Sequence, residues 1–200
     1  MGGGKMKEIV LATRNKHKIE EIRAILGDTG LKIFTLDDFQ GCPETVEDGD
    51  TFQENAIKKA RTVCSFTGKT ALSDDSGLEV DVLNGSPGVI SARFAGDGCS
   101  YKDNNIKLLE LMKNVNKNMR GARFRCVAVL CKPDGELKTV EGTCKGDIAL
   151  EERGEGGFGY DPLFIVPFYG KTFAELPVEI KNRISHRAIA FAKIKELICR

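Results

Sequence analysis

Short apolar segments alternate with helix-start signals along the first half of the chain, and this order restricts the fold more than any other feature. Glu8–Ala12 and Leu31–Leu36 have the apolar, partly β-branched character of strands. Asn15 follows the first segment as a helix cap, and Thr51-x-x-Glu54 forms a capping box that opens a second helix. Strands separated by capped helices are typical of α/β proteins.

The second half adds a hairpin to this pattern. Arg123–Cys131 and Leu137–Gly142 are predicted strands, and Pro133-Asp-Gly135 between them is a hairpin-type turn. Further strands and helix caps are predicted at Thr70–Ser73, Leu78–Leu83, Ser100 and Ser185. Because helix-linked and hairpin-linked strands occur together, the sequence predicts an α/β fold with a mixed sheet.

Length and charge limit the partners of the chain. We expect one domain over residues 1–200, with residues 1–6 as a flexible leader or tag remnant. Lys and Arg total 30 against 29 Asp and Glu, a net charge of +1, which argues against a nucleic-acid partner. The longest apolar runs, such as Cys126–Cys131, are too short to span a membrane.

The cysteines point to a reduced, cytoplasmic protein. There are 7 of them at irregular spacing without a C-x-x-C pair, and only 2 histidines accompany them. A structural zinc site therefore has little support, and reduced thiols are the simpler interpretation.

The first candidate site is Leu11–Lys18, where a strand leads through a turn into a helix. Free N–H groups at a helix N-terminus bind anions, Thr13 and Asn15 add hydrogen bonds, and Lys16 and Lys18 add charge. This combination suits a triphosphate. The alternative is a capped helix with solvated lysines.

The second candidate is Ser73-Asp-Asp-Ser-Gly77, predicted to follow a strand. Adjacent carboxylates at a strand end are costly unless they are paired or bind a metal, and Mg²⁺ prefers such oxygen ligands. An acidic loop could complete the site with Glu47, Asp48 or Asp50. The alternative is a turn whose side chains bind the backbone.

The third candidate is the glycine-rich stretch Gly154–Pro162. It contains G-x-G-x-x-G, but Tyr-Asp-Pro follows and no helix opens there, so we reject a dinucleotide fingerprint. Phe158 and Tyr160 could instead stack on a base. The alternative is an ordinary turn with two core aromatics.

The fourth candidate combines Lys181 with Ser185-His186-Arg187. Cations in the first turn of a helix oppose its dipole, so His186 and Arg187 suggest a nearby anionic or polar ligand. The alternative is a solvated first turn without a ligand.

Together these segments resemble the inosine triphosphate pyrophosphatase family. The matching pieces are ATRNKHK, TFQENAIKKA, SDDSGLEVDVLNGSPGVISARFAG, GGFGYDPLF, KTFAEL and ISHR, within residues 11–187. The resemblance implies an elongated, twisted mixed sheet with flanking helices, and two lobes around a nucleotide groove. It also implies a homodimer and a Mg²⁺ requirement.

The resemblance also implies roles for individual residues. Asp75 would be the catalytic acidic residue and, with Glu47, a metal ligand; Asp48 stays open as a replacement for Glu47. The phosphates would bind Thr13, Arg14, Asn15, Lys16, His17 and Lys18. The remaining substrate contacts would be Ser76, Phe158, Gly159, Tyr160, Asp161, Lys181, His186 and Arg187. Arg14 is a departure, because many members have glycine there.

The expected activity is Mg²⁺-dependent hydrolysis of ITP, dITP and XTP to the monophosphate and pyrophosphate, which removes aberrant purines from the nucleotide pool. Water would attack the α-phosphorus, Asp75 or a neighbour would take its proton, and Lys18 and Lys181 would stabilise the leaving charge. Alternatives are a related pyrophosphatase for pyrimidine or modified nucleotides and a non-catalytic nucleotide-binding sensor.

Overall fold

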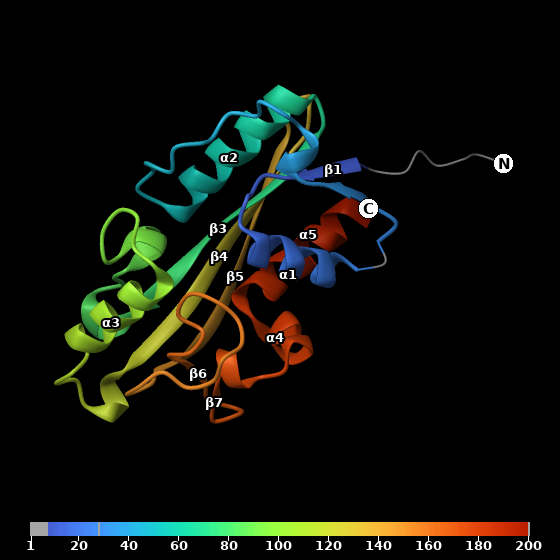
Figure 1. Cartoon of the computed structure of the whole chain (residues 1–200). Helices are drawn as coiled ribbons and strands as arrows, with labels where there is room; N and C mark the ends of the chain where they lie inside the picture. The colour runs from blue at the N-terminus through green and yellow to red at the C-terminus, as the bar shows by residue number, and fades with distance from the viewer. Residues whose placement is uncertain (1–7, 28, 200) are drawn as a thin grey trace. The chain divides into compact units, whose positions relative to one another are not determined.

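A seven-stranded mixed sheet organises the part of the chain that the structure describes, residues 8–27 and 29–199 of a computed structural model (Figure 1). The strand order is β2-β1-β3-β4-β5-β6-β7. The strands are β1 (Glu8–Leu11), β2 (Lys32–Phe34), β3 (Thr70–Val80), β4 (Gly121–Cys131), β5 (Leu137–Ile148), β6 (Phe164–Val166) and β7 (Lys171–Thr172). β1 pairs in parallel with β2 and β3, whereas β6 is antiparallel to β5 and β7. The predicted mixed α/β sheet is therefore confirmed, and the predicted leader at 1–6 lies outside the described residues.

The chain divides into two compact units. Unit 1 comprises Met1–Asp75, Val127–Glu141 and Ala190–Arg200, and unit 2 comprises Ser76–Cys126 and Gly142–Ile189. The division falls between Asp75 and Ser76, inside β3.

Unit 1 contains α1 (Lys16–Leu26), α2 (Phe52–Thr67) and most of α5 (His186–Cys199), and Figure 1 shows α1 and α2 on opposite sides of its strands. Both predicted caps are confirmed. The Asn15 side chain accepts from the N–H of Lys18, and Thr51 and Glu54 cap each other's backbone. The core is formed by the buried side chains of Val10, Leu11, Ile22, Leu26, Ala56, Ala60, Val63, Leu72, Val129, Phe191 and Ile194.

Unit 2 contains α3 (Tyr101–Leu111), which begins at the predicted Ser100 capping box, and α4 (Val178–Ile184). Aromatic rings occupy its core. The ring centroids of Phe124 and Phe164 are 4.7 Å apart, and those of Phe164 and Phe173 are 5.1 Å apart. Ser185 caps α5 as predicted, because its hydroxyl accepts from the N–H of Ala188 at 3.1 Å.

The main error of the sequence prediction concerns β3. The sequence predicts two short strands, Thr70–Ser73 and Leu78–Leu83, whereas Thr70–Val80 is one strand that includes both aspartates and Asp81–Leu83 is a short 3₁₀ helix. Charged side chains are tolerated inside a strand when each has a partner. Here Asp74 pairs with Lys18 and Asp75 with Lys59, so no turn is needed to expose them.

β5 is also longer than predicted, because it continues past Gly142 to Ile148. Glycine inside a predicted strand often marks the end or a break of that strand. Gly146 instead allows the backbone of β6 to lie close to β5. A Cβ at Gly146 would lie 2.3 Å from the Ile165 carbonyl oxygen and 2.6 Å from the Phe164 ring. The glycine therefore lets β6 pair with the end of β5.

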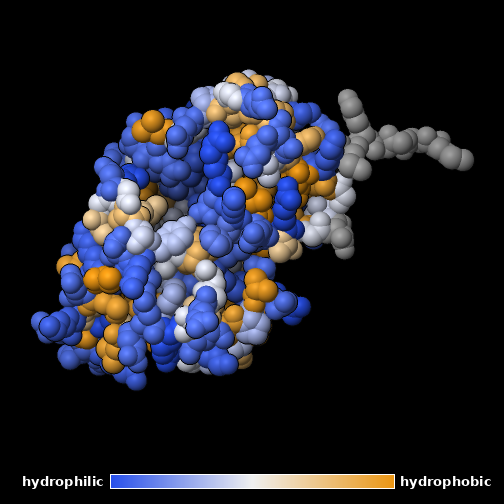
Figure 2. Space-filling model, viewed as in Figure 1, coloured by the Kyte–Doolittle hydropathy of each residue, from blue (hydrophilic) through white to orange (hydrophobic). Residues whose placement is uncertain are grey.

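None of the helices among the described residues has both the length and the apolar character needed to cross a membrane. Figure 2 shows hydrophilic residues over most of the visible face, with apolar residues in smaller groups. Among the described residues, Phe168 has the most exposed large apolar side chain, with 88% of its surface accessible.

Candidate active site

Strand alternation on β3 distributes three polar side chains between two helices of unit 1. Successive strand residues point to opposite faces, so Ser73 and Asp75 share one face and Asp74 has the other. The Ser73 hydroxyl donates to the Ala56 carbonyl of α2 at 2.6 Å, whereas Asp74 lies 3.1 Å from the Lys18 ammonium of α1. Both aspartates are buried.

Asp75 and Glu47 converge on a single cation. The Lys59 Nζ of α2 lies 3.2 Å from Asp75 Oδ1 and 2.9 Å from Glu47 Oε1. Asn55, one turn earlier on α2, donates its side-chain N–H to Asp75 Oδ2 at 3.3 Å. We call Glu47, Asp74, Asp75 and Lys59 the acidic cluster.

Burial and charge shift the pKa values in this cluster. Desolvation raises the pKa of Asp75, although the positive charges of Lys59 and Lys18 oppose it. Desolvation disfavours the charged form of Lys59, but the carboxylates of Asp75, Glu47 and Asp74 outweigh it and raise the pKa of that lysine. Lys59 is therefore a buried cation held by the carboxylates around it.

The acidic cluster has a suitable donor set for a hard divalent cation. The Lys59 ammonium occupies a position on which one loop carboxylate and one strand carboxylate already converge. Carboxylate oxygens are the ligands that Mg²⁺ prefers, and it keeps several waters besides one or two of them. Among the described residues no group of three or more His, Cys, Asp or Glu is arranged to hold a metal, so waters or substrate would have to complete the coordination.

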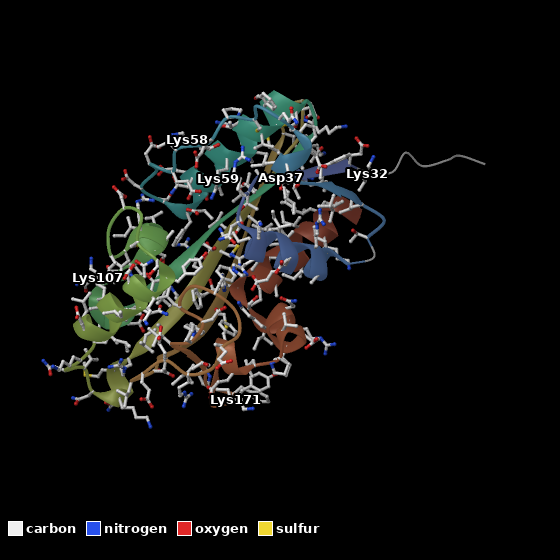
Figure 3. The ribbon with its side chains drawn as sticks, in the orientation of Figure 1. Lys32, Asp37, Lys58, Lys59, Lys107 and Lys171 are labelled. Atoms are coloured by element: carbon white, nitrogen blue, oxygen red, sulfur yellow. The ribbon has the colours of Figure 1, made fainter. Side chains whose placement is uncertain are left out.

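Asp48, the alternative to Glu47, has a different partner. Its carboxylate lies 2.6 Å from Lys58 Nζ, and both side chains are largely solvent-exposed. Figure 3 shows Lys58 and Lys59 on α2. Adjacent lysines of one helix thus pair with adjacent acids of one loop, but only Lys59 also reaches Asp75.

The start of α1 has the features of an anion site. The Thr13 hydroxyl accepts from the N–H of Asn15 at 3.2 Å, and Asn15 caps the helix. Lys16 and His17 are exposed. Arg14 is exposed too, and it donates to the Cys42 carbonyl at 3.1 Å, so it links this turn to the loop that leads to Glu47.

A second cluster lies in unit 2 and consists of Phe158, Asp161, Lys181 and Arg187; we call it the aromatic–cationic cluster. Asp161 accepts from the N–H of Phe158 at 2.8 Å and forms a buried ion pair with Lys181. Lys181 Nζ lies 4.9 Å from the Phe158 ring centroid, and the Arg187 guanidinium lies 5.7 Å from it. Cations facing an aromatic ring at these distances are attracted to it.

Arg187 is almost completely buried, with 2% exposed. Its Nη2 donates to the Ser76 hydroxyl at 2.8 Å. The Gly159 carbonyl accepts from Asn105 at 3.2 Å, which fixes the loop that carries Phe158. The structure thus brings together Ser76, Phe158 and Arg187, three of the substrate contacts that the resemblance implies.

Two predicted substrate contacts lie in the core. Tyr160 is 4% exposed and its hydroxyl donates to the Ser91 carbonyl at 2.9 Å, while burial raises the pKa of this phenol. His186 is buried and stacks on Phe124 with centroids 4.7 Å apart. Of the two aromatics in the glycine-rich stretch, Phe158 is therefore the one placed beside the cations.

Lys59 and Asn55 were missed by the sequence analysis. Both are buried on the face of α2 that also carries Phe52, Ala56 and Ala60. The available signal was a lysine and an asparagine, four residues apart, interrupting an apolar helix face. Buried lysine needs a paired charge, so this interruption indicates an acidic partner.

Comparisons with known proteins identify the family of the chain. The sequence profile of the Ham1 family matches residues 9–197. A protein of Desulforamulus reducens named dITP/XTP pyrophosphatase is 52% identical over 193 residues, which is 96% of each chain. A protein of the same name from Geobacter sulfurreducens is 50% identical over 191 residues, again 96% of each.

Solved structures give the same result. The Staphylococcus aureus Ham1 protein matches with a TM-score of 0.86 and 41% identity, over 96% of this chain and 98% of that one. A HAM1 protein from Coxiella burnetii matches with a TM-score of 0.88 and 40% identity at the same coverage. The family profile, the full-length relatives and the structural neighbours confirm the resemblance inferred from the motifs, and the chain belongs to the Ham1 family.

Proposed function

We propose that this chain is a Mg²⁺-dependent pyrophosphohydrolase that converts ITP, dITP and XTP to the monophosphate and pyrophosphate. The observation that carries the proposal is the convergence of Glu47 and Asp75 on one cationic position. The name dITP/XTP pyrophosphatase, borne by relatives about half identical to this chain, supports the substrate class. Its role would be to remove aberrant purines from the nucleotide pool.

Glu47 and Asp75 would hold the metal ion. Bound there, Mg²⁺ would neutralise phosphate oxygens and make a water molecule more acidic. We assign the proton of the attacking water to Asp75 or a neighbouring carboxylate, because a general base must lie within hydrogen-bond reach of that water and these carboxylates converge at the proposed site. Attack at the α-phosphorus would release pyrophosphate.

The phosphates would bind at the start of α1. The N–H groups there and the helix dipole favour anions, and Thr13, Asn15 and Lys18 line the same turn. Lys18 already faces Asp74, so its charge lies close to the acidic cluster. We assign Lys18 to stabilisation of the departing pyrophosphate.

The base would bind the aromatic–cationic cluster. Phe158 offers a ring for stacking, and Lys181 and Arg187 offer donors for the C6 keto oxygen of hypoxanthine or xanthine. We assign Lys181 to the base rather than to the leaving group, because it pairs with Asp161 and faces Phe158. Adenine carries a donor at C6 and would leave these groups unpaired.

We also propose that the enzyme is cytoplasmic and a homodimer. The cytoplasmic assignment rests on the cysteine pattern, and the dimer rests on the family resemblance. Light scattering at micromolar concentration should give about twice the mass of one chain, and a monomer would contradict the dimer.

Product analysis tests the reaction type. With ITP and Mg²⁺, a phosphate-detecting dye should respond only after inorganic pyrophosphatase is added, and EDTA should abolish the response. Free phosphate without added pyrophosphatase, together with accumulation of the diphosphate, would identify a different hydrolase. Binding of ITP without product would identify a sensor.

A further inference from the structure

Lys59 occupies the position that the proposed metal ion requires. Its ammonium lies 2.9 Å from Glu47 Oε1 and 3.2 Å from Asp75 Oδ1, and its side chain is only 9% exposed. An ammonium ion at that point and a divalent cation bound to the same oxygens would repel each other strongly at so short a distance. A metal ion bound to these two oxygens would therefore displace Lys59 from them.

We propose that Lys59 is an internal cation that competes with the metal, so that the free protein binds Mg²⁺ weakly and the nucleotide increases the metal affinity. This inference rests on the proposed metal site at Glu47 and Asp75. In the free protein the ammonium offsets one of the two negative charges of Glu47 and Asp75. When a triphosphate binds, its oxygens offer Lys59 another set of acceptors, and the carboxylates become available to the metal.

The side chain of lysine is suited to such an exchange. Its charge is a compact ammonium on a flexible four-carbon stem, so it can change partners without moving the helix. A buried ammonium is costly without a negative partner, which explains why Lys59 would not leave the carboxylates before a phosphate is present. Metal and nucleotide then bind with positive coupling, and the coupling must be the same in both directions.

A purely structural role for Lys59 makes the opposite prediction for the metal. If the lysine only held Glu47 and Asp75 in place, its removal would disorder the ligands and weaken metal binding. If it competes, its removal strengthens metal binding to the free protein. The direction of the change therefore separates the two roles.

The experiment measures Mn²⁺ binding, from the electron paramagnetic resonance signal of the unbound ion, with and without an ITP analogue that has a methylene bridge between the α- and β-phosphorus atoms. The variants are Lys59→Met, Glu47→Gln and a matched control, Lys58→Met. Lys58 is the adjacent lysine of α2, pairs with exposed Asp48, and removes the same charge from the chain.

For Lys59→Met we expect the Mn²⁺ affinity of the free protein to rise by about 5- to 150-fold, the usual range of coupling between sites. The analogue should then add little further affinity, whereas it should strengthen Mn²⁺ binding to the native protein. Lys58→Met should behave like the native protein.

Unchanged or weaker Mn²⁺ binding by Lys59→Met would overturn the competition. If Glu47→Gln still lowers Mn²⁺ affinity in that case, the metal site of the proposed function stands. If Glu47→Gln changes nothing even with the analogue, the metal binds elsewhere, and both the metal site and the competition are wrong.

Thermal unfolding provides a second readout. Without metal, Lys59→Met should unfold at a lower temperature than the native protein, because its buried carboxylates lose a counter-charge. Mg²⁺ should raise the Tm of Lys59→Met more than it raises the native Tm, because a site that binds Mg²⁺ more tightly gains more stability at the same metal concentration. An equal or smaller Mg²⁺-dependent rise in the variant would overturn the competition. If methionine prevents folding, Lys59→Gln serves as the second variant with the same expectation.

Discussion

Asp74 and Asp75 are adjacent on β3 but face opposite sides of the strand, where Asp74 contacts Lys18 of α1 and Asp75 contacts Lys59 of α2. One strand thus connects the helix start proposed to bind phosphates with the helix that borders the proposed metal site. The alternation of strand side chains gives neighbouring carboxylates separate partners.

Asp75→Asn should retain the fold and lose most activity. The amide keeps the shape of the carboxylate and can still contact Asn55, but it cannot accept a proton at neutral pH. Loss of a general base typically lowers kcat by about 10²–10⁴-fold. Steady-state pyrophosphate release gives kcat, and circular dichroism confirms folding. A folded variant with near-native kcat would contradict the assignment of Asp75.

Glu47→Gln and Asp48→Asn form a matched pair that identifies the loop ligand. Glu47 shares Lys59 with Asp75, whereas Asp48 is paired with exposed Lys58. Glu47→Gln should therefore raise the Mg²⁺ concentration needed for half-maximal activity, and Asp48→Asn should leave it close to native. A larger effect from Asp48→Asn would assign the ligand to Asp48 instead.

The sequence distance between interacting residues decides which parts of this site can be predicted from sequence. Caps at Asn15, Thr51 and Ser100 depend on residues within one helical turn, and all were predicted correctly. The continuity of β3 depends on Lys18 and Lys59, which are distant in sequence, so local patterns predict two separate strands there.

The same limit applies to the aromatic residues of the glycine-rich stretch. Phe158 and Tyr160 are two residues apart and both are plausible stacking partners in the sequence. Only the fold shows that the Tyr160 hydroxyl is bound to Ser91 in the core, while Phe158 faces Lys181. α4 was also missed, because it has few turns and ends directly before the cap of α5.

Gly157→Ala should destabilise the protein and reduce activity. Its backbone has a φ of +73°, and a Cβ there would lie 2.1 Å from Asp161 Oδ2. The strained backbone alone costs about 1–3 kcal/mol of unfolding free energy. Gly159→Ala is the control, with a φ of +63° but no atom within 4 Å of its Cβ outside its own chain neighbours.

Urea denaturation should thus show a larger loss for Gly157→Ala than for Gly159→Ala, because only the former also displaces Asp161. Equal losses would mean that the contact with Asp161 has no influence on stability.

Arg187→Ala should weaken the preference for ITP over ATP. The guanidinium is buried beside Ser76 and Phe158. When adenine is bound, this buried donor lacks an acceptor at C6, and such an unpaired group costs about 1–3 kcal/mol of binding free energy. We expect kcat/KM for ITP to fall more than kcat/KM for ATP. An ITP-to-ATP ratio equal to that of the native enzyme would exclude Arg187 from base selection.

The native selectivity is the most direct test of the proposed function. kcat/KM should be measured by pyrophosphate release for ITP, XTP, GTP and ATP under identical Mg²⁺ conditions. Sites built around hydrogen bonds can discriminate by about 10⁴–10⁵-fold. We expect values for ITP and XTP far above those for ATP and GTP, because an enzyme that removes rare purines must spare the abundant ones. Comparable kcat/KM for ITP and ATP would contradict it, even if pyrophosphate were the product.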